Sequence, residues 1–417
     1  METAVAGIVS MWQALSLVGI LGWVILSPFL GLTRILRSSL QPWVVRRVID
    51  ETPMILTVQS LQHRHLDVFF SVLSFCVSVP FYTGFLPLLF WSGHGKLARQ
   101  VTLLIAFCDY VGNTIKDLIS APRPNFPSIR ILTATDDEKE HAMEFGLPSS
   151  HALNTVCLAG YLLHHYTLEG GSGGNFEDDR WTFFIGFFVV SLLVILIAVA
   201  RVYLGMHSIV DVMAGIVIGI VLLSFWKTVD KQIDDFIISD LNVTSFSAAL
   251  SLLLCFAYPT PERPTPSFEF HVAFTGVAFG IVSGVQQTFH QFHHDGVARV
   301  FTSQLTVPMF IGRVLVGIPV ILVVKFCSKT LSKWVLPVIC NTLGIPVRSS
   351  CYIPALKAHD GNDNYSQSKL TKGYFQKLLF TIQDSYDVDT GIRFLQYAGL
   401  AWSVVDLVPS IFCRLRL

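Results

Sequence analysis

Charged residues are scarce in this chain of 417 residues. Only 14% of the residues are charged and 52% are hydrophobic, which is far more apolar than a soluble protein of this length requires. The 29 basic and 29 acidic residues cancel, so the chain lacks the basic excess that nucleic-acid binding requires. The composition therefore predicts a protein whose surface faces lipid and that has no nucleic-acid partner.

Cysteine pairs and a cleavable leader are also missing. The eight cysteines form no CxxC pair and lie mostly in apolar runs, so we expect small packing residues rather than a disulfide or zinc framework. The first apolar run, residues 7–32, has neither a basic segment before it nor a small-residue cleavage pattern after it. This pattern indicates a retained span rather than a signal peptide.

Long apolar runs alternate with polar loops along the chain and predict an all-α, polytopic membrane helical bundle with about ten spans. We divide it into an N-terminal span with a basic juxtamembrane segment (1–60), a core (61–230) and a C-terminal membrane region (231–417). A polar segment at about 348–389 interrupts the last part, and its composition indicates no function. The runs cover residues 7–32, 67–91, 97–119, 150–168, 181–200, 209–226, 246–258, 272–285, 305–327, 334–343 and 394–412.

Three clusters of polar side chains lie at the ends of neighbouring predicted spans. The chain leaves the membrane after the first cluster, re-enters at the second and crosses twice before the third, so all three emerge on one membrane face. Ionisable groups are costly near hydrocarbon, so their grouping indicates a site. The clusters are Lys116 with Arg123; Ser149, Ser150 and His151; and Arg201, His207 and Asp211.

These residue types suit a phosphoryl group. The arginine fork matches phosphate oxygens and lysine adds a point charge, so Lys116, Arg123 and Arg201 could stabilise phosphoryl transfer without a metal. Ser149 and Ser150 stand where a helix begins, where hydroxyls and free backbone amides could hold the same anion. The sequence therefore predicts phosphate binding at a membrane surface.

The two histidines could fill two catalytic roles, nucleophile and general acid. If a helix begins at about His207, Asp211 lies on the same face one turn later and can hold the imidazole. We therefore expect His207 to be the nucleophile and Asp211 to orient it. That leaves His151 as the general acid that protonates the leaving alkoxide.

Each residue also has an ordinary structural interpretation. Lys116 could snorkel from the end of a span, Arg123 could be an interfacial anchor, and Pro148 with its two serines could simply start a helix. Order, spacing and a shared face together argue against these separate explanations. Three further histidines at i, i+3 and i+4 spacing could present imidazoles to a metal, but an exposed loop or helix end is the commoner outcome, and we predict no metal site; they are His290, His293 and His294.

The spacing of the three clusters resembles the three-part signature of the type 2 phosphatidic acid phosphatase superfamily. Lysine, six residues and Arg-Pro are followed by Pro-Ser-x-His, and then by arginine, five residues, histidine, three residues and aspartate. Residues 116–124 and 200–211 look most like the sphingosine-1-phosphate phosphatase branch. Residues 133–151 and 394–406 are similar to its plant-type members.

The resemblance implies a membrane enzyme that hydrolyses long-chain sphingoid base 1-phosphates to the free base and phosphate through a phosphohistidine, with no cofactor. It also implies an endoplasmic reticulum membrane, with the lipid substrate presented from the bilayer to a lumenal site. The implied roles agree with those argued above: phosphate binding by Lys116, Arg123 and Arg201, phosphorylation of His207, support by Asp211, and protonation of the leaving oxygen by His151.

Two positions depart from the commonest form of the signature. Ser150 stands where a glycine is common, and Ala200 where a serine often precedes the arginine. Ala200 lacks a hydroxyl that could have touched phosphate, so we expect one hydrogen bond fewer. Ala200→Ser should then not reduce turnover.

Other functions remain open at this stage. A phosphatase for phosphatidate or for a polyprenyl phosphate or diphosphate would use the same motifs. A transporter for an anionic solute would also place charges within spans. The basic residues give conflicting indications of which membrane face carries the site. Lys96 and Arg99 lie on the face opposite the predicted site and favour a lumenal site, whereas the basic segment of residues 34–64 lies on the same face as the site and favours a cytosolic one.

Overall fold

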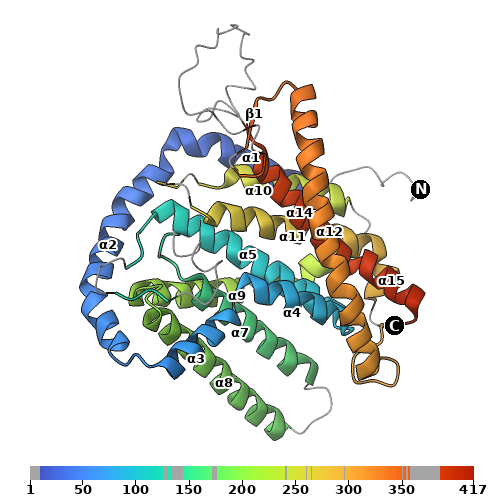
Figure 1. Ribbon diagram of the computed structural model, residues 1–417, viewed down its shortest axis with the longest axis horizontal. Helices are drawn as coiled ribbons and strands as arrows, with labels where there is room; N and C mark the ends of the chain where they lie inside the picture. Colours follow the sequence, from blue (N-terminus) through green and yellow to red (C-terminus); the bar gives the residue numbers. More distant parts are fainter. Residues whose placement is uncertain are drawn as a thin grey trace.

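The computed structural model is a helical bundle in which two two-residue strands are the only strands of the described residues (Figure 1). The all-α prediction is confirmed. The description covers residues 10–124, 129–132, 144–170, 176–239, 242–259, 261–263, 265–294, 296–349, 351–353, 356 and 386–417. The helices are α1 Met11–Leu30, α2 Leu32–Gln59, α3 Arg64–Phe75, α4 Val79–Trp91, α5 Gly95–Ile119, α7 Ser150–Gly170, α8 Phe176–Tyr203, α9 Ile209–Ile237, α10 Val243–Ala257, α11 Ser267–Thr288, α12 Val307–Thr342, α14 Val388–Val405 and α15 Leu407–Leu415, with a π-helical turn, η1, at Phe289–His293.

The prediction of about ten spans is not confirmed. Five helical stretches of the described chain are long and apolar enough to cross a membrane, or up to seven if two bent helix pairs each count as one. The runs 305–327 and 334–343 belong to one helix, α12, because helix-compatible lysines and serines bridge them. The run 67–91 is instead divided into α3 and α4, which are bent by 51° where Ser78 caps α4.

The outward faces of α8 and α12 are hydrophobic. Only 11% of the most apolar window of each helix is buried inside the protein, and Phe188 and Trp334 are among the large side chains that point outward. Apolar surface on this scale requires lipid around it. The protein is therefore a multi-pass membrane protein, as the composition predicted.

The centre of the bundle is formed by α5, α7 and α9. All eight cysteines are free, and Cys108 and Cys157 pack in this core as expected. Helices α7 and α9 approach so closely that a Cβ on Gly215 would lie 2.6 Å from the carbonyl oxygen of Ser149. This close contact holds the start of α7 against the start of α9, where two of the predicted clusters lie.

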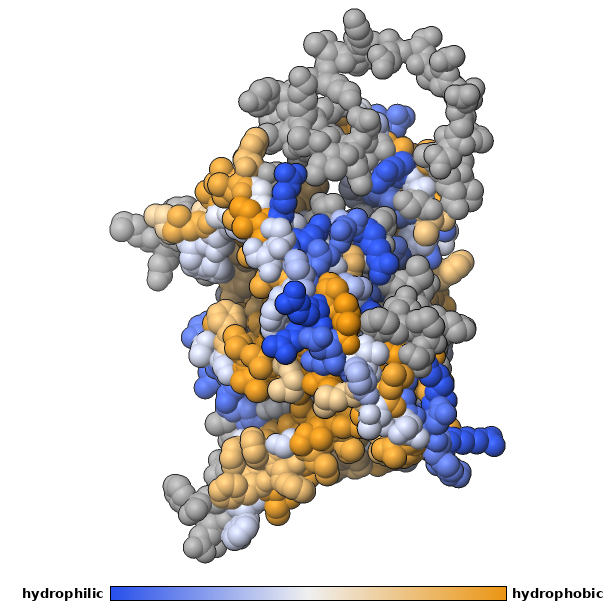
Figure 2. Space-filling view, turned by 90° about the vertical axis from the view of Figure 1, so that its left-hand side faces the viewer, coloured by the Kyte–Doolittle hydropathy of each residue, from blue (hydrophilic) through white to orange (hydrophobic). Residues whose placement is uncertain are grey.

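Helix α2 lies across the ends of α5, α8 and α9 (Figure 1). Its Arg37 donates to the carbonyl of Asp117 (2.9 Å), and its Gln59 donates to that of Tyr203 (3.0 Å). Its Glu51 accepts from the amide of Val210 (2.9 Å). These bonds satisfy backbone groups that helix ends leave without partners. Figure 2 shows this face, where hydrophilic side chains gather at the centre.

The C-terminal region packs onto the core through α11. Helix α14 runs parallel to α11, and glycines 276 and 280 bring the two backbones into contact. Strands β1 (Val347–Arg348) and β2 (Tyr386–Asp387) pair at the base of the polar segment predicted at 348–389, and most of this segment lies outside the described residues. Asp389 fixes its base by accepting from the Ser349 hydroxyl and the Cys351 amide, both at 2.6 Å.

Candidate active site

The three polar clusters meet at one cavity of about 30 Å³. It lies where α5 ends, α7 begins and the chain turns from α8 into α9. Asp211 and Ser149 do not line it; the Ser149 amide instead donates to the carbonyl of Asp211 (2.9 Å), which joins the starts of α7 and α9. The predicted site residues that line the cavity are Lys116, Arg123, Ser150, His151, Arg201 and His207.

The three predicted phosphate-binding cations are all buried. Lys116 is in the last turn of α5, which ends at Ser120 in the left-handed conformation, and Arg123 follows in the extended chain. Arg201 is in the last turn of α8 and donates to the Ser74 hydroxyl (2.5 Å). Buried cations need anions or strong acceptors, so this cavity favours an anionic ligand.

Glu144 is a site residue that the sequence reasoning missed. Its carboxylate is only 1% exposed, lies 2.5 Å from the Lys116 ammonium and lies 3.5 Å from the Arg123 guanidinium. It therefore contacts two of the three cations that are expected to hold phosphate. The only sequence signal was an acid shortly before Pro148, close to the charged run of residues 136–141.

The contacts of Arg123 fix the tautomer of His207. The Arg123 Nη1 lies 3.0 Å from the His207 Nε2 and donates to the Met206 carbonyl at 2.6 Å. Because a guanidinium can only donate, the His207 Nε2 is the acceptor and the ring proton is on Nδ1. An unprotonated Nε2 facing the cavity is the form that a nucleophile requires.

His207 is held neutral by its surroundings. Burial lowers its pKa well below the ordinary value, and the positive charges of Arg123, Arg201 and Lys116 lower it further. A lowered pKa keeps the imidazole unprotonated at neutral pH. The site therefore maintains the nucleophilic form without help from solvent.

Asp211 acts on His207 from the first turn of α9. The helix begins at Ile209 and not at about His207, because Ser208 is its N-cap and forms a capping box with Asp211. The Asp211 Oδ2 accepts from the Ser208 amide (2.9 Å) and lies 3.7 Å from the His207 Nδ1, beyond normal hydrogen-bond length. Such contacts often shorten only when a ligand binds.

The turn before His207 depends on a glycine. Gly205 has a φ of 71°, which side-chain-bearing residues rarely adopt, and a Cβ there would lie 2.4 Å from the carbonyl oxygen of Arg130. The chain can therefore reverse between Arg201 and His207, and both residues point into the same cavity.

A second polar group lines the deeper part of the cavity. Asp109 and Asn113 lie on the face of α5 that carries Lys116, two turns and one turn before it, and Asn154 lies one turn after His151 on α7. Asp109 is buried, accepts from the Asn113 amide nitrogen (2.8 Å) and forms no ion pair with any described residue. The signature motifs do not contain these residues, so the sequence reasoning missed them.

The histidines near position 290 lie at the other end of α5. His293 is buried, contacts the Val405 carbonyl at 2.7 Å and lies against Gly95. Across the described part of the chain, no three His, Cys, Asp or Glu side chains form a group that could hold a metal. His293 has a packing role in the contact between η1 and α14.

Comparison with known proteins places these features in a family. The PAP2 superfamily pattern matches residues 97–234, which contain all the predicted site residues. Lipid phosphate phosphatase delta of Arabidopsis thaliana is 59% identical over 407 residues, covering 97% of each chain. A dihydrosphingosine 1-phosphate phosphatase of Schizosaccharomyces pombe is 27% identical over 400 residues, covering 92% of each chain.

Two further relatives match part of the chain. Mouse sphingosine-1-phosphate phosphatase 2 is 25% identical over 204 residues, covering 49% of this chain and 54% of its own. The crystal structure of a PAP2-type phosphatidylglycerolphosphate phosphatase from Bacillus subtilis is 19% identical and covers 54% of this chain and 98% of its own, with a TM-score of 0.37.

The protein belongs to the PAP2 superfamily. Within it, the protein is an integral membrane lipid phosphate phosphatase, a phosphomonoester hydrolase. The predictions of family and of enzyme class are thus confirmed.

Proposed function

We propose that this protein hydrolyses long-chain sphingoid base 1-phosphates to the free base and inorganic phosphate. The observation that carries the proposal is the meeting of three cations and two histidines at one buried cavity in a lipid-embedded bundle. The names of the dihydrosphingosine and sphingosine phosphate phosphatases among its relatives support the sphingoid substrate.

The first step transfers the phosphoryl group to His207. The lone pair of its Nε2 attacks phosphorus while the bond between phosphorus and the lipid oxygen breaks. Protonated His151 gives its proton to that oxygen, and the free base leaves as an alcohol. Lys116, Arg123 and Arg201 stabilise the charge on the three other oxygens.

The second step releases phosphate. Water attacks phosphorus, the bond between phosphorus and Nε2 breaks, and His151 accepts the proton of the attacking water. The Nδ1 proton of His207 faces Asp211 throughout, so the carboxylate stabilises the positive charge of the phosphorylated ring. Both histidines return to their starting protonation states.

The buried carboxylate of Asp109 favours a substrate that carries an amine. A sphingoid base carries an ammonium group next to the carbon that bears the phosphate, whereas phosphatidate and polyprenyl phosphates carry none. A buried carboxylate without a cationic partner among the described residues favours such a group. Phosphate would then be held near Lys116 and the ammonium near Asp109, which lies deeper along α5.

We assign the protein to the endoplasmic reticulum membrane with its site on the lumenal face, as the resemblance implies. The charges do not add support, because Arg99 is buried in an ion pair with Asp234 and is no free interfacial charge, whereas α2 places arginines on the site's side. The sequon at Asn242 lies at the opposite end of α9 from the site. A lumenal site requires Asn242 to remain unglycosylated, and glycosylation there would contradict the assignment.

A substrate panel tests the proposed activity. Purified enzyme in one detergent is given a sphingoid base 1-phosphate, phosphatidate, and a polyprenyl phosphate and diphosphate, and released phosphate is measured. We expect the sphingoid substrate to have the highest kcat/KM, and His207→Ala to abolish its turnover while the exposed His290→Ala retains it. Preference for another substrate would overturn the substrate assignment, and unreduced turnover by His207→Ala would overturn the mechanism.

A further inference from the structure

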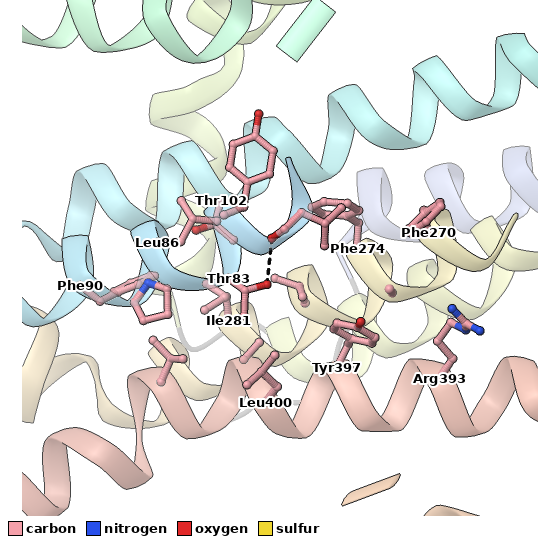
Figure 3. A pocket seen from close by; sticks show the side chains of 17 residues that line it. Thr83, Leu86, Phe90, Thr102, Phe270, Phe274, Ile281, Arg393, Tyr397 and Leu400 are labelled. Atoms are coloured by element: carbon pink, nitrogen blue, oxygen red, sulfur yellow. Dashed lines mark hydrogen bonds between the residues drawn. The ribbon is translucent and has the colours of Figure 1, made fainter. Parts of the chain in front are cut away.

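An apolar cavity of about 80 Å³ lies between α4, α11 and α14 (Figure 3). Its few hydroxyl-bearing threonines do not offer their hydroxyls to a ligand. Thr83 donates to the carbonyl of Val79 (2.9 Å) and Thr102 donates to that of Ala98 (2.7 Å), both within their own helices. Arg393 lines one end of the cavity, where its guanidinium pairs with Glu269. The remaining walls are mainly methyl, methylene and aromatic groups, which favours a hydrocarbon ligand.

This cavity adjoins the phosphatase site. Four side chains line both cavities: Val79, Tyr82, Phe270 and Phe274. Phe270 and Phe274 are one turn apart near the start of α11, which is the site end of that helix because Thr265, just before it, donates to Asp117 on α5 (3.0 Å). A molecule with its head in the site can extend directly into the apolar cavity.

The cavity runs along the bundle away from the site. Phe270 lies at one end and Phe90 at the other (Figure 3). The lining residues of α11 extend from Phe270 to Ile281, which corresponds to roughly 16 Å of helix at about 1.5 Å per residue. This length matches the depth of one leaflet, about half of a hydrocarbon core of roughly 30 Å.

We propose that this cavity binds the hydrocarbon tail of the lipid phosphate while the site binds its head, an inference that rests on the proposed function. The glycine contacts between α11 and α14 fix the back wall, because a Cβ on Gly280 would lie 2.3 Å from the carbonyl oxygen of Ala398. The C-terminal helices α11 and α14 therefore form the wall against which the tail would lie.

Filling the cavity tests this assignment. Val277→Phe and Ala273→Leu each add volume to its wall on α11, whereas the matched Val221→Phe adds the same volume at a residue that is 60% exposed on α9. Each variant is assayed on sphingoid base 1-phosphates of eighteen and eight carbons in one detergent. Burying a methylene contributes about 0.8 kcal/mol, so each excluded methylene lowers kcat/KM about fourfold.

We expect Val277→Phe and Ala273→Leu to lower kcat/KM for the long substrate at least tenfold, with less than a twofold change for the short one. Val221→Phe should change neither. Unchanged hydrolysis of the long substrate by both cavity variants, or equal losses for both chain lengths in both variants, would overturn the tail assignment. If the wild type cleaves no sphingoid phosphate, the proposed function fails first, and the tail assignment fails with it.

Discussion

Glu144 occupies the place where phosphate is expected to bind. Its carboxylate contacts Lys116 at 2.5 Å and Arg123 at 3.5 Å, so an incoming phosphate must displace it from both cations. Glu144→Gln removes the competing negative charge and retains the shape. We therefore expect this variant to bind inorganic phosphate and vanadate more tightly than the wild type.

The size of the effect follows from the displaced contact. A buried hydrogen bond between charged groups contributes about 1.5–3 kcal/mol. Removing this competition should lower the inhibition constant of phosphate by about 13- to 160-fold. The same substitution should destabilise the protein, because Lys116 is only 2% exposed and loses its anionic partner. The melting temperature without ligand should therefore fall, and it should recover when phosphate is added.

The assay measures competitive inhibition of lipid phosphate hydrolysis by phosphate and vanadate at constant ionic strength. Glu262→Gln, an exposed acid outside the cavity, is the matched control and should leave both inhibition constants unchanged. Weaker phosphate inhibition in Glu144→Gln would refute the reasoning. It would mean that Glu144 helps to hold the phosphate site in its binding form.

Further predictions concern recognition, protonation and stability. Asp109→Asn should reduce the preference for sphingoid base 1-phosphate over a single-chain lipid phosphate without an amine by about tenfold or more, and an unchanged ratio of kcat/KM values would contradict ammonium binding. The neutral form of His207 is the nucleophile and its pKa is lowered, so activity should persist as the pH falls through about 6.5. The test is the pH profile of kcat/KM, with the acidic limb assigned to His207 by NMR of the labelled ring. An acidic limb of His207 at or above pH 6.5 would contradict this. Arg99→Ala leaves the buried Asp234 carboxylate without its partner and should destabilise the protein by about 3–5 kcal/mol, seen as a lower melting temperature in detergent, whereas the exposed Lys96→Ala should not. Ala200 packs in an apolar cluster and does not line the site cavity, so the expected loss of a hydrogen bond to phosphate has no support in the structure. Ala200→Ser should retain full turnover, and a large loss would count against the match to the third part of the signature.

The meeting of the polar clusters could be predicted from the sequence because it depends on counting crossings. The chain between Lys116 and Arg201 has one polar loop, two apolar runs and one turn, and the structure brings their ends to one cavity. The helix start at Ile209 was predicted less accurately, because Ser208 and Asp211 form the capping box while Asp211 also faces His207. The sequence pattern indicated the role of Asp211 beside His207 but not its second role in capping the helix.

The residues that tune the site could not be predicted. Glu144 reaches the cations across 28 positions of sequence, and Asp109 enters the cavity only because α5 is buried on nearly all sides. The apolar cavity is equally non-local, because it depends on α14 packing beside α11 across more than a hundred residues. Apolar periodicity predicts that such helices are buried but not which helices they face.

The proposed mechanism depends above all on His207 as the residue that receives the phosphoryl group. Wild-type enzyme and His207→Ala are mixed with a radiolabelled lipid phosphate and quenched in alkali during turnover, and the label is located by peptide mass spectrometry. We expect label on His207 in the wild type, none in the variant, and a loss of turnover of at least about a thousandfold. Label on another residue, or near-normal turnover by the variant, would contradict it.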